Sequence, residues 1–372
     1  MSQPILFSPL TLRGLTLRNR VVVSPMCQYQ AVDGAVQNWH FAHHARFALG
    51  GVGTAFVEAT GVTAEGRITP GCTGLWSDSH IPGLRRITDL YRAHGVVPAI
   101  QLGHAGRRAS CERPWDGGLP LATGGKEAPW PIVGPSPVPE RDAAPVPREL
   151  TITDIDGLVD AFRSAFRRAL AAGFDIVEIH GAHGYLIHSF FSPLSNQRTD
   201  GYGGSLGNRM RFALRIAEAA REIWPKDRPV FYRASVVDGI DGGVSLEDTV
   251  GLAKELKVRG VDVIDCSSGG MAGSVTLSGK KLKPGFQVPL STGVRRGADI
   301  ATMAVGVILT GPQAEAILAE GNADLIAIGR EFLADPNWCL HAAEALGADN
   351  PFAQLPKYYA FYLERRAAVL ER

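Results

Sequence analysis

Cysteine is scarce in this chain, and the few that occur form no recognisable set. The five cysteines are an odd number, and no two of them are spaced as a C-x-x-C pair. We therefore expect neither a disulfide framework nor a cysteine-based zinc or redox motif. No stretch approaches the ~18 uninterrupted apolar residues that a membrane helix needs. The first residues carry no basic segment followed by an apolar one, so we expect no secretory signal and a cytoplasmic protein.

An excess of charge of one sign is missing as well. Lys and Arg total 38 against 37 Asp and Glu, which gives a formal net charge of +1. This balance argues against a nucleic acid or an anionic membrane as a partner. No G-x-G-x-x-G fingerprint follows an apolar run, so a nucleotide-binding domain of that type is not expected.

Short apolar runs that resemble buried parallel strands recur along the whole chain. Such runs are expected where both faces of a strand are covered. We predict strands at residues 20–24, 54–60, 97–102, 174–180, 230–234, 261–266, 300–305 and 325–329.

Helical patterns separate most of these runs. We predict helices at residues 38–49, 82–93, 154–172, 208–223, 245–259, 311–320 and 336–346. In the third of these, Thr153 and Asp156 fit an N-terminal capping box. Strands and helices that alternate about eight times predict an α/β fold, a single (β/α)8 TIM barrel, with an open doubly wound sheet as the alternative. One domain spanning residues 1–372 accounts for the chain, with a short C-terminal tail at about 350–372.

Two long segments interrupt the alternation, at residues 104–147 and 184–207. Both follow the carboxyl ends of predicted strands. In a barrel that end carries the active site, because the loops there are free to vary while the scaffold stays rigid. We therefore expect extended loops and the functional site on the C-terminal face.

The densest polar cluster, His180, His183 and Tyr185, begins where the fourth apolar run ends. Imidazole N–H groups can donate to a carbonyl oxygen as it gains negative charge, and a phenol can supply a proton. Packing at the barrel mouth is the structural alternative. Zinc binding, with His104 and His188 as further ligands, is disfavoured because no acidic residue lies inside the cluster.

Three residues near the last two strands suggest a phosphate site. Gly306 follows the seventh run, and Gly329 and Arg330 end the eighth. Loops at these places in barrels often bind phosphate through backbone N–H groups, and an arginine adds a charge-assisted hydrogen bond.

Polar residues also occur within or just after otherwise apolar strands. Ser24, Pro25, Met26 and Cys27 end the first run, while Gln101 and Arg233 lie inside the third and fifth. A barrel interior is normally apolar, so an inward arginine needs a partner. An electron-rich ring would serve, and so would an internal salt bridge to Glu58 or Glu178.

Taken together, these segments resemble the Old Yellow Enzyme family. The run at 180–209, HGAHGYLIHSFFSPLSNQRTDGYGGSLGNR, is similar to the family signature. The run at 6–29, LFSPLTLRGLTLRNRVVVSPMCQY, resembles the thermophilic-like subgroup to which xenobiotic reductase A belongs. QLGHAGR at 101–107 and ADLIAIGR at 323–330 extend the resemblance, which covers about residues 6–338.

The resemblance implies a non-covalent FMN in the barrel. It places Gln101 at the pyrimidine edge of the flavin and Arg233 near its N1 and O2, where a cation stabilises the reduced ring. Gly306, Gly329 and Arg330 correspond to the phosphate site. The residues that it places along the flavin ring are Ser24, Pro25, Met26, Cys27, Ala59 and His180.

The resemblance also implies a catalytic reaction and the residues that perform it. NAD(P)H, meaning NADPH or NADH, reduces the flavin and leaves, and an α,β-unsaturated carbonyl compound, or a nitro compound, then takes its place. His180 and His183 correspond to the pair that binds the carbonyl oxygen, and Tyr185 to the proton donor. Tyr29 matches a further ligand-binding residue, and Cys27 one that tunes the flavin and touches substrate. No metal is implied, and the expected assembly is a homodimer or homotetramer.

Other functions are compatible with parts of the pattern. A hydrolase or isomerase could use the histidines as metal ligands or bases, and a flavin-binding barrel could lack catalysis. A dehydrogenase running in the oxidising direction is disfavoured by Tyr185. In the tail, Tyr358 or Tyr362 could reach the active site of its own chain or of a neighbouring subunit, or the tail could simply pack in the core or a dimer interface.

Overall fold

Eight parallel strands form a closed barrel in the computed structural model, which describes residues 3–271 and 281–370. Each strand pairs with the next along the chain, and the last pairs with the first. The strands are β3 (Val21–Val23), β4 (Thr54–Gly61), β5 (Val97–Gly103), β8 (Ile176–Gly181), β9 (Val230–Ser235), β10 (Val263–Ser267), β11 (Ala301–Ala304) and β12 (Leu325–Ile328). The predicted (β/α)8 barrel is confirmed, and the open sheet is excluded.

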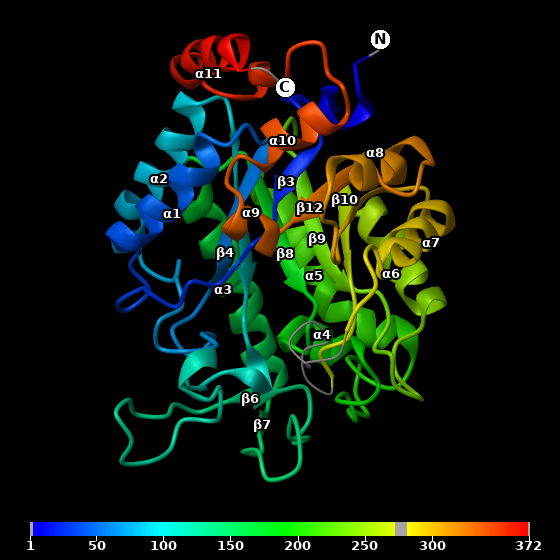
Figure 1. Cartoon of the computed structure of the whole chain (residues 1–372). Helices are drawn as coiled ribbons and strands as arrows, with labels where there is room; N and C mark the ends of the chain where they lie inside the picture. The colour runs from blue at the N-terminus through cyan, green and yellow to red at the C-terminus, as the bar shows by residue number, and fades with distance from the viewer. Residues whose placement is uncertain (1–2, 272–280, 371–372) are drawn as a thin grey trace.

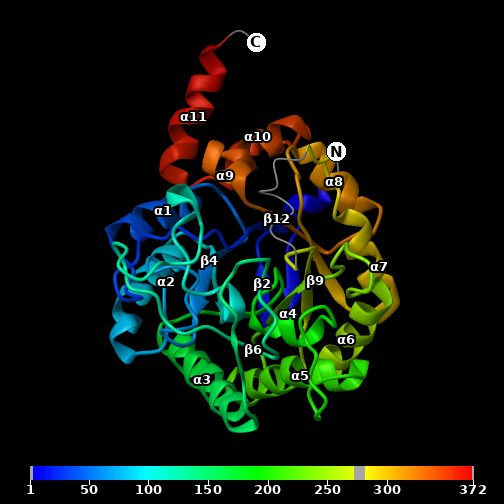
Figure 2. The ribbon, with the colours of Figure 1, turned by 90° about the horizontal axis from the view of Figure 1, so that it is seen from below.

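Helices surround the barrel, as Figure 2 shows along its axis. They are α1 (Asn38–Ala48), α2 (Ile81–Ala93), α3 (Ile152–Ala171), α5 (Leu206–Ile223), α6 (Leu246–Val258), α7 (Val288–Ala298), α8 (Gly311–Ala319) and α10 (Trp338–Ala345). In α3, Leu158, Phe162 and Phe166 recur at helical spacing and are buried. Burying this apolar face against the strands stabilises the helix more than its intrinsic propensity does.

The end of the barrel interior away from the long loops is closed by apolar side chains from all eight strands. Alternate residues of a strand point to the same side, so one set fills the interior while the other faces the helices. A hairpin of β1 (Leu10–Leu12) and β2 (Leu15–Leu17) packs against this set. The buried interior residues are Val22, Phe56, Ala99, Ile176, Phe231, Val263, Met303, Leu325 and Ala327.

The predicted N-terminal cap of α3 was wrong, and one helix was not predicted. The capping residue of α3 is Thr151, whose hydroxyl accepts from the Asp154 N–H while the Asp154 carboxylate accepts from the Thr151 N–H. Thr153 lies inside the helix, because an equally good capping pair stands two residues earlier. The sequence prediction also missed α7, which contains Gly293 and Gly297.

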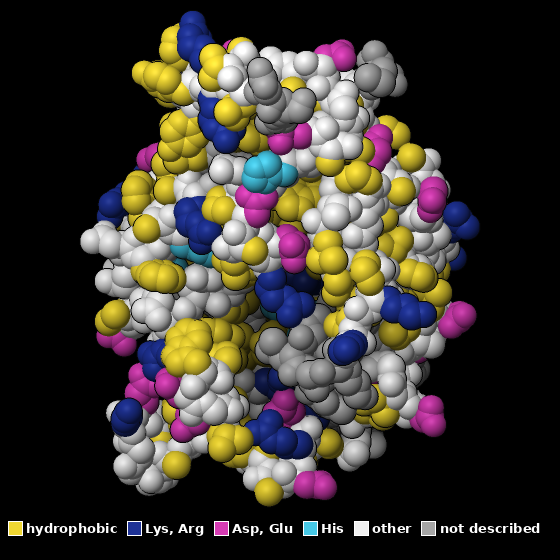
Figure 3. Space-filling view, in the orientation of Figure 1, with side chains coloured by type: hydrophobic (Ala, Val, Ile, Leu, Met, Phe, Trp, Pro, Cys, Tyr) yellow, Lys and Arg dark blue, Asp and Glu magenta, His cyan; other side chains and the backbone are white. Residues whose placement is uncertain are grey.

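The tail lies at the opposite end of the barrel from the long loops. Figure 1 places α11 (Lys357–Val369) at the top, and α4 (Leu186–Phe191), β6 (Val133–Gly134) and β7 (Arg148–Glu149) at the bottom. No residue of α11 is buried, so core packing of this helix is excluded. Figure 3 shows its hydrophobic side chains on the surface at the top left. Residues 371 and 372 of the predicted tail lie outside the described part of the chain.

Candidate active site

A tight turn after β8 brings His180, His183 and Tyr185 together. The ring of His180 lies 5.2 Å from that of His183 and 5.0 Å from that of Tyr185, centroid to centroid. The backbone is left-handed at His183 (φ 60°) and at Gly184 (φ 74°). A side chain at position 184 would also collide with the Gly270 carbonyl oxygen, 2.3 Å from a Cβ there. Only glycine meets both demands, and this turn makes the cluster possible.

A buried pair behind the turn holds it in place. The N–H of Gly184 donates to His188 Nδ1 over 2.9 Å, and His188 Nε2 lies 2.9 Å from Asp238 Oδ1. Because Nδ1 accepts, the proton of a neutral His188 sits on Nε2, the nitrogen that lies beside the carboxylate. Both side chains are fully buried. His188 therefore supports the turn, and its ring is engaged away from His180 and His183.

Arg108 is a second support, which the sequence reasoning missed. Its guanidinium donates to the carbonyl oxygen of His183 and lies 5.4 Å from the centre of the Tyr185 ring. The Glu140 carboxylate pairs with it at 2.8 Å. The arginine thus fixes both the backbone of the turn and the face of the phenol.

Burial sets the protonation states in the cluster. It lowers the pKa of both His180 and His183, so their rings stay neutral near pH 7, and it raises the pKa of Tyr185, so the hydroxyl keeps its proton. His183 Nε2 lies 2.7 Å from the hydroxyl oxygen of Ser267. The cluster therefore offers neutral imidazoles and an intact phenol.

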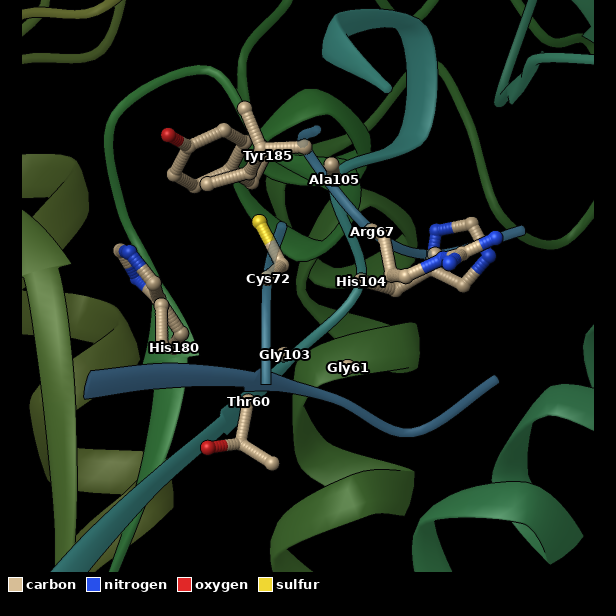
Figure 4. A pocket seen from close by; sticks show the side chains of 12 residues that line it. Thr60, Gly61, Arg67, Cys72, Gly103, His104, Ala105, His180 and Tyr185 are labelled. Atoms are coloured by element: carbon tan, nitrogen blue, oxygen red, sulfur yellow. The ribbon is translucent and has the colours of Figure 1, made fainter. Parts of the chain in front are cut away.

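A cavity lies beside the cluster, with about 270 Å³ of empty space including its opening to solvent. In Figure 4, His180 and Tyr185 lie on one side of Cys72, and Arg67 and His104 on the other. Burial lowers the pKa of His104 to about 4 and raises that of Cys72 to about 11. The sequence reasoning considered His104 only as a metal ligand and did not single out Cys72 or Arg67, because residues from separate loops carry no shared spacing.

The segment after β3 reaches the same mouth. Burial raises the pKa of the Cys27 thiol well above its usual range and also that of Tyr29. Cys27 is therefore a neutral thiol. Tyr29 has left-handed backbone (φ 53°), and its ring packs edge-on against Trp115 at 5.7 Å. Ala59, at the end of β4, lines the cavity.

Gln101 and Arg233 both point into the barrel, and each has a carboxylate partner. The Gln101 amide nitrogen donates to Glu178 Oε1 over 2.8 Å. Arg233 Nε lies 3.1 Å from Asp265 Oδ2, a residue that the sequence reasoning missed. Glu58, one of the two partners expected for Arg233, instead lies 3.2 Å from His40 Nε2.

The residues predicted to bind phosphate follow two neighbouring strands. Gly306 comes after β11 with left-handed backbone (φ 113°). Gly329 caps the short helix α9 (Arg330–Ala334), in which Arg330 is the first residue and is exposed. A Cβ at Gly329 would lie 3.5 Å from Met26 Sδ, so this glycine adjoins the segment after β3. Pro25 belongs to that segment and is partly buried.

The mouth of the barrel has the properties that a flavin requires. His180 Nδ1 is buried and makes no hydrogen bond within the described residues. Unpaired buried polar atoms are costly unless a ligand meets them. Arg233, whose Nε pairs with Asp265, also offers a buried cation, which suits an electron-rich ring. Nowhere in the described residues, this site included, do three His, Cys, Asp or Glu side chains come together as a metal-ligand set.

The fold and this site define a class: a (β/α)8-barrel oxidoreductase that uses a flavin. Residues 5–349 match the model of the NADH:flavin oxidoreductase / NADH oxidase family. The chain belongs to this family, the Old Yellow Enzyme family that the sequence motifs resembled. The predictions of an enzyme, of FMN and of a nicotinamide reductant are thereby confirmed.

Individual relatives agree with the family. The chain is 46% identical over 347 residues to an NADPH dehydrogenase of Geobacillus sp. (strain WCH70), covering 93% of this chain and 95% of that protein. The structure of morphinone reductase matches with a TM-score of 0.76 and 28% identity, over 93% of this chain and 91% of that one. A 2-naphthoyl-CoA reductase structure matches with a TM-score of 0.81 and 26% identity. The match covers 94% of this chain and 53% of that longer one.

No helix among the described residues is long and apolar enough to cross a membrane.

Proposed function

We propose that this enzyme reduces the activated C=C bond of α,β-unsaturated carbonyl compounds, and nitro compounds as a further class, in two separate half-reactions. NADPH or NADH delivers reducing equivalents in the first, and the unsaturated compound receives them in the second. The observation that carries the proposal is the convergence of two neutral imidazoles and a protonated phenol within about 5 Å at the barrel mouth. Such a set can bind an oxygen that gains charge and hold a proton ready.

FMN would supply the hydride-transfer chemistry once bound. Gln101 and Arg233 would meet its pyrimidine edge, and Ser24, Pro25, Met26, Cys27, Ala59 and His180 would line the ring. Gly306, Gly329 and Arg330 would hold its phosphate, supported by their place after the last two strands of the barrel. The reductant and the substrate would alternate at the mouth of the barrel.

His180 and His183 would bind the carbonyl oxygen of the substrate through their N–H groups. Since both rings are neutral, each offers one N–H donor and adds no charge to the site. Tyr185 would deliver its phenolic proton to the carbon next to the carbonyl group. Tyr29 follows Cys27 in the segment after β3 and would contact the same ligand. Cys27 would contact both ring and substrate as a neutral thiol.

The test is an anaerobic stopped-flow experiment on the purified protein. The enzyme is reduced with NADPH and then mixed with 2-cyclohexenone while the flavin absorbance is followed. We expect the absorbance to bleach and then to recover rapidly in the second mixing step. Saturated cyclohexanone is the matched control and should give no recovery. Bleaching without recovery on the enone would refute ene-reduction, while a protein that holds no flavin even after addition of FMN would refute the whole assignment.

We also propose that the enzyme is a cytoplasmic homodimer or homotetramer that α11 helps to assemble. Four aromatic side chains on this helix, those of Tyr358, Tyr359, Phe361 and Tyr362, are exposed in the single chain. Because α11 and the candidate site lie at opposite ends of the barrel (Figure 1), the tail cannot serve the site of its own chain. A neighbouring subunit is the partner that such a surface fits.

Truncation after Leu355 tests this assembly. We expect the truncated protein to have a lower molar mass by light scattering and altered enone kinetics, because the exposed aromatic surface is gone. The control is the double variant Tyr358→Phe with Tyr362→Phe, which keeps both rings. Unchanged mass and kinetics after truncation would show that α11 contributes to neither.

A further inference from the structure

Four polar side chains form a layer inside the barrel, next to the apolar interior and on the side of the long loops. Each stands two positions after an interior apolar residue of the same strand, and alternate residues face the same side. The register pairs Gln101 with Glu178, and Arg233 with Asp265. The members of this polar layer and the apolar residues before them are Gln101 after Ala99, Glu178 after Ile176, Arg233 after Phe231 and Asp265 after Val263.

The polar layer is sealed from solvent. Glu178 and Asp265 are 0% exposed, Gln101 2% and Arg233 8%. The guanidinium reaches Asp265 through Nε at 3.1 Å and the Ser24 hydroxyl through Nη1 at 3.4 Å. Glu178 receives a hydrogen bond from the neutral amide of Gln101. The cation is therefore matched with one carboxylate, and the other carboxyl has a neutral partner.

The charges of the polar layer indicate that one of its two carboxyl groups holds a proton. One guanidinium and two carboxylates would leave a buried net negative charge, which the barrel interior would solvate poorly. The charged and titratable groups nearby do not compensate it, because His180, the register partner of Arg233, is neutral. Burial and the neighbouring Asp265 raise the pKa of Glu178, and burial also raises the pKa of Asp265, while the charge of Arg233 opposes these effects at both carboxyls. The geometry separates the two, because the guanidinium contacts Asp265 and the Gln101 amide contacts Glu178.

We propose that Asp265 is the counterion of Arg233 and that Glu178 is a neutral acid that positions Gln101. Together they set the net charge that the barrel presents to the flavin. This inference rests on the proposed placement of FMN at Gln101 and Arg233. Glu178 and Asp265 act through their neighbours, so they are positioning residues. Asp265 offsets part of the positive field of Arg233, and that field stabilises the negative charge that the cofactor gains on reduction.

The test compares Asp265→Asn with Glu178→Gln in the flavin-loaded enzyme. The midpoint potential of the bound flavin is measured by equilibration with a reference dye. We expect Asp265→Asn to shift the equilibrium at least tenfold toward reduced flavin, which is about 30 mV for a two-electron couple. Glu178→Gln should change this equilibrium by less than a factor of two, because glutamine keeps a neutral group of the same shape.

A matched control and a second measurement complete the design. Asp299→Asn also removes one carboxylate, but an exposed one that pairs with Lys257 outside the barrel, and should not shift the potential. The infrared spectrum of the wild-type holoenzyme should contain the band of a buried protonated carboxylic acid, which Glu178→Gln removes. This measurement does not require Asp265→Asn to fold.

Three results would overturn the proposal: an unchanged potential in Asp265→Asn, equal shifts in both variants, or no acid band that depends on Glu178. Each leaves the ene-reductase proposal standing. That proposal fails separately, when the wild-type enzyme shows no recovery with the enone.

Discussion

Replacing Tyr185 with phenylalanine is expected to slow enone reduction about 100-fold or more while leaving flavin reduction by NADPH nearly unchanged. A positioned general acid typically contributes a factor of about 10² to 10⁴. Only the second half-reaction needs that acid, since the substrate carbon must receive a proton. The structure favours this role because burial holds the Tyr185 hydroxyl in its protonated form. Stopped-flow measurement of the two half-reactions separates the effects.

Tyr202→Phe is the matched control for that experiment. Its hydroxyl accepts a hydrogen bond from Arg215, away from the turn, so the variant removes a phenolic oxygen without touching the cluster. Both half-reactions should then run at wild-type rates. Equal losses in the two half-reactions of Tyr185→Phe would argue against the proton-donor role and for a general disturbance of the site.

The second large effect is expected for the double variant His180→Ala with His183→Ala. It should weaken the binding of phenols, whose oxygen resembles the charged oxygen of the reacting substrate, by about 10- to 100-fold. Each lost hydrogen bond contributes about 0.5–1.5 kcal/mol, and 1.4 kcal/mol corresponds to a factor of ten in affinity. Titration of the flavin spectrum with p-chlorophenol measures this change.

His104→Ala serves as the control for the histidine pair. It removes another buried, neutral imidazole, which lines the same cavity as His180 but lies on the other side of Cys72 (Figure 4). Phenol affinity should change little. An unaltered spectrum titration in the double variant would mean that the two histidines do not bind the ligand oxygen.

The two variant sets probe different steps of one reaction. The phenol titration reports how the imidazoles bind an oxygen before any chemistry, whereas the Tyr185 experiment reports proton transfer alone. A loss of binding with an intact proton step, or the reverse, would therefore assign the roles of the three residues separately. Because all three side chains come from one turn, variants that deform the turn would impair both readouts together.

Local sequence patterns were sufficient for the barrel and for the turn. Eight short apolar runs predicted the eight strands, since a strand covered on both faces needs apolar residues throughout. The cluster His180, His183 and Tyr185 lies within six consecutive residues, so its position after β8 followed directly from the chain. The same holds for Gly329, which comes at the end of β12.

Helix α7 illustrates where local patterns fail. Gly293 and Gly297 lower its intrinsic helical propensity, and so no helix was predicted there. In the fold, both glycines face α6: a Cβ at Gly293 would lie 2.7 Å from Leu246 Cδ2, and one at Gly297 2.7 Å from Val250 Cγ2. The close approach of the two helices selects glycine, and packing then stabilises a helix that the sequence alone does not favour.

By itself, then, the sequence determined the barrel, the turn that carries His180, His183 and Tyr185, and the family, because each depends on residues that are near one another in the chain or on motifs in fixed order. Only the tertiary structure decided that Arg233 pairs with Asp265, that Asp238 holds the turn through His188, and that α11 lies far from the site of its own chain. These facts join strands and loops that are distant in sequence. The physical reason is that a pairing between buried charges is selected by distance and burial, and neither is encoded in local spacing.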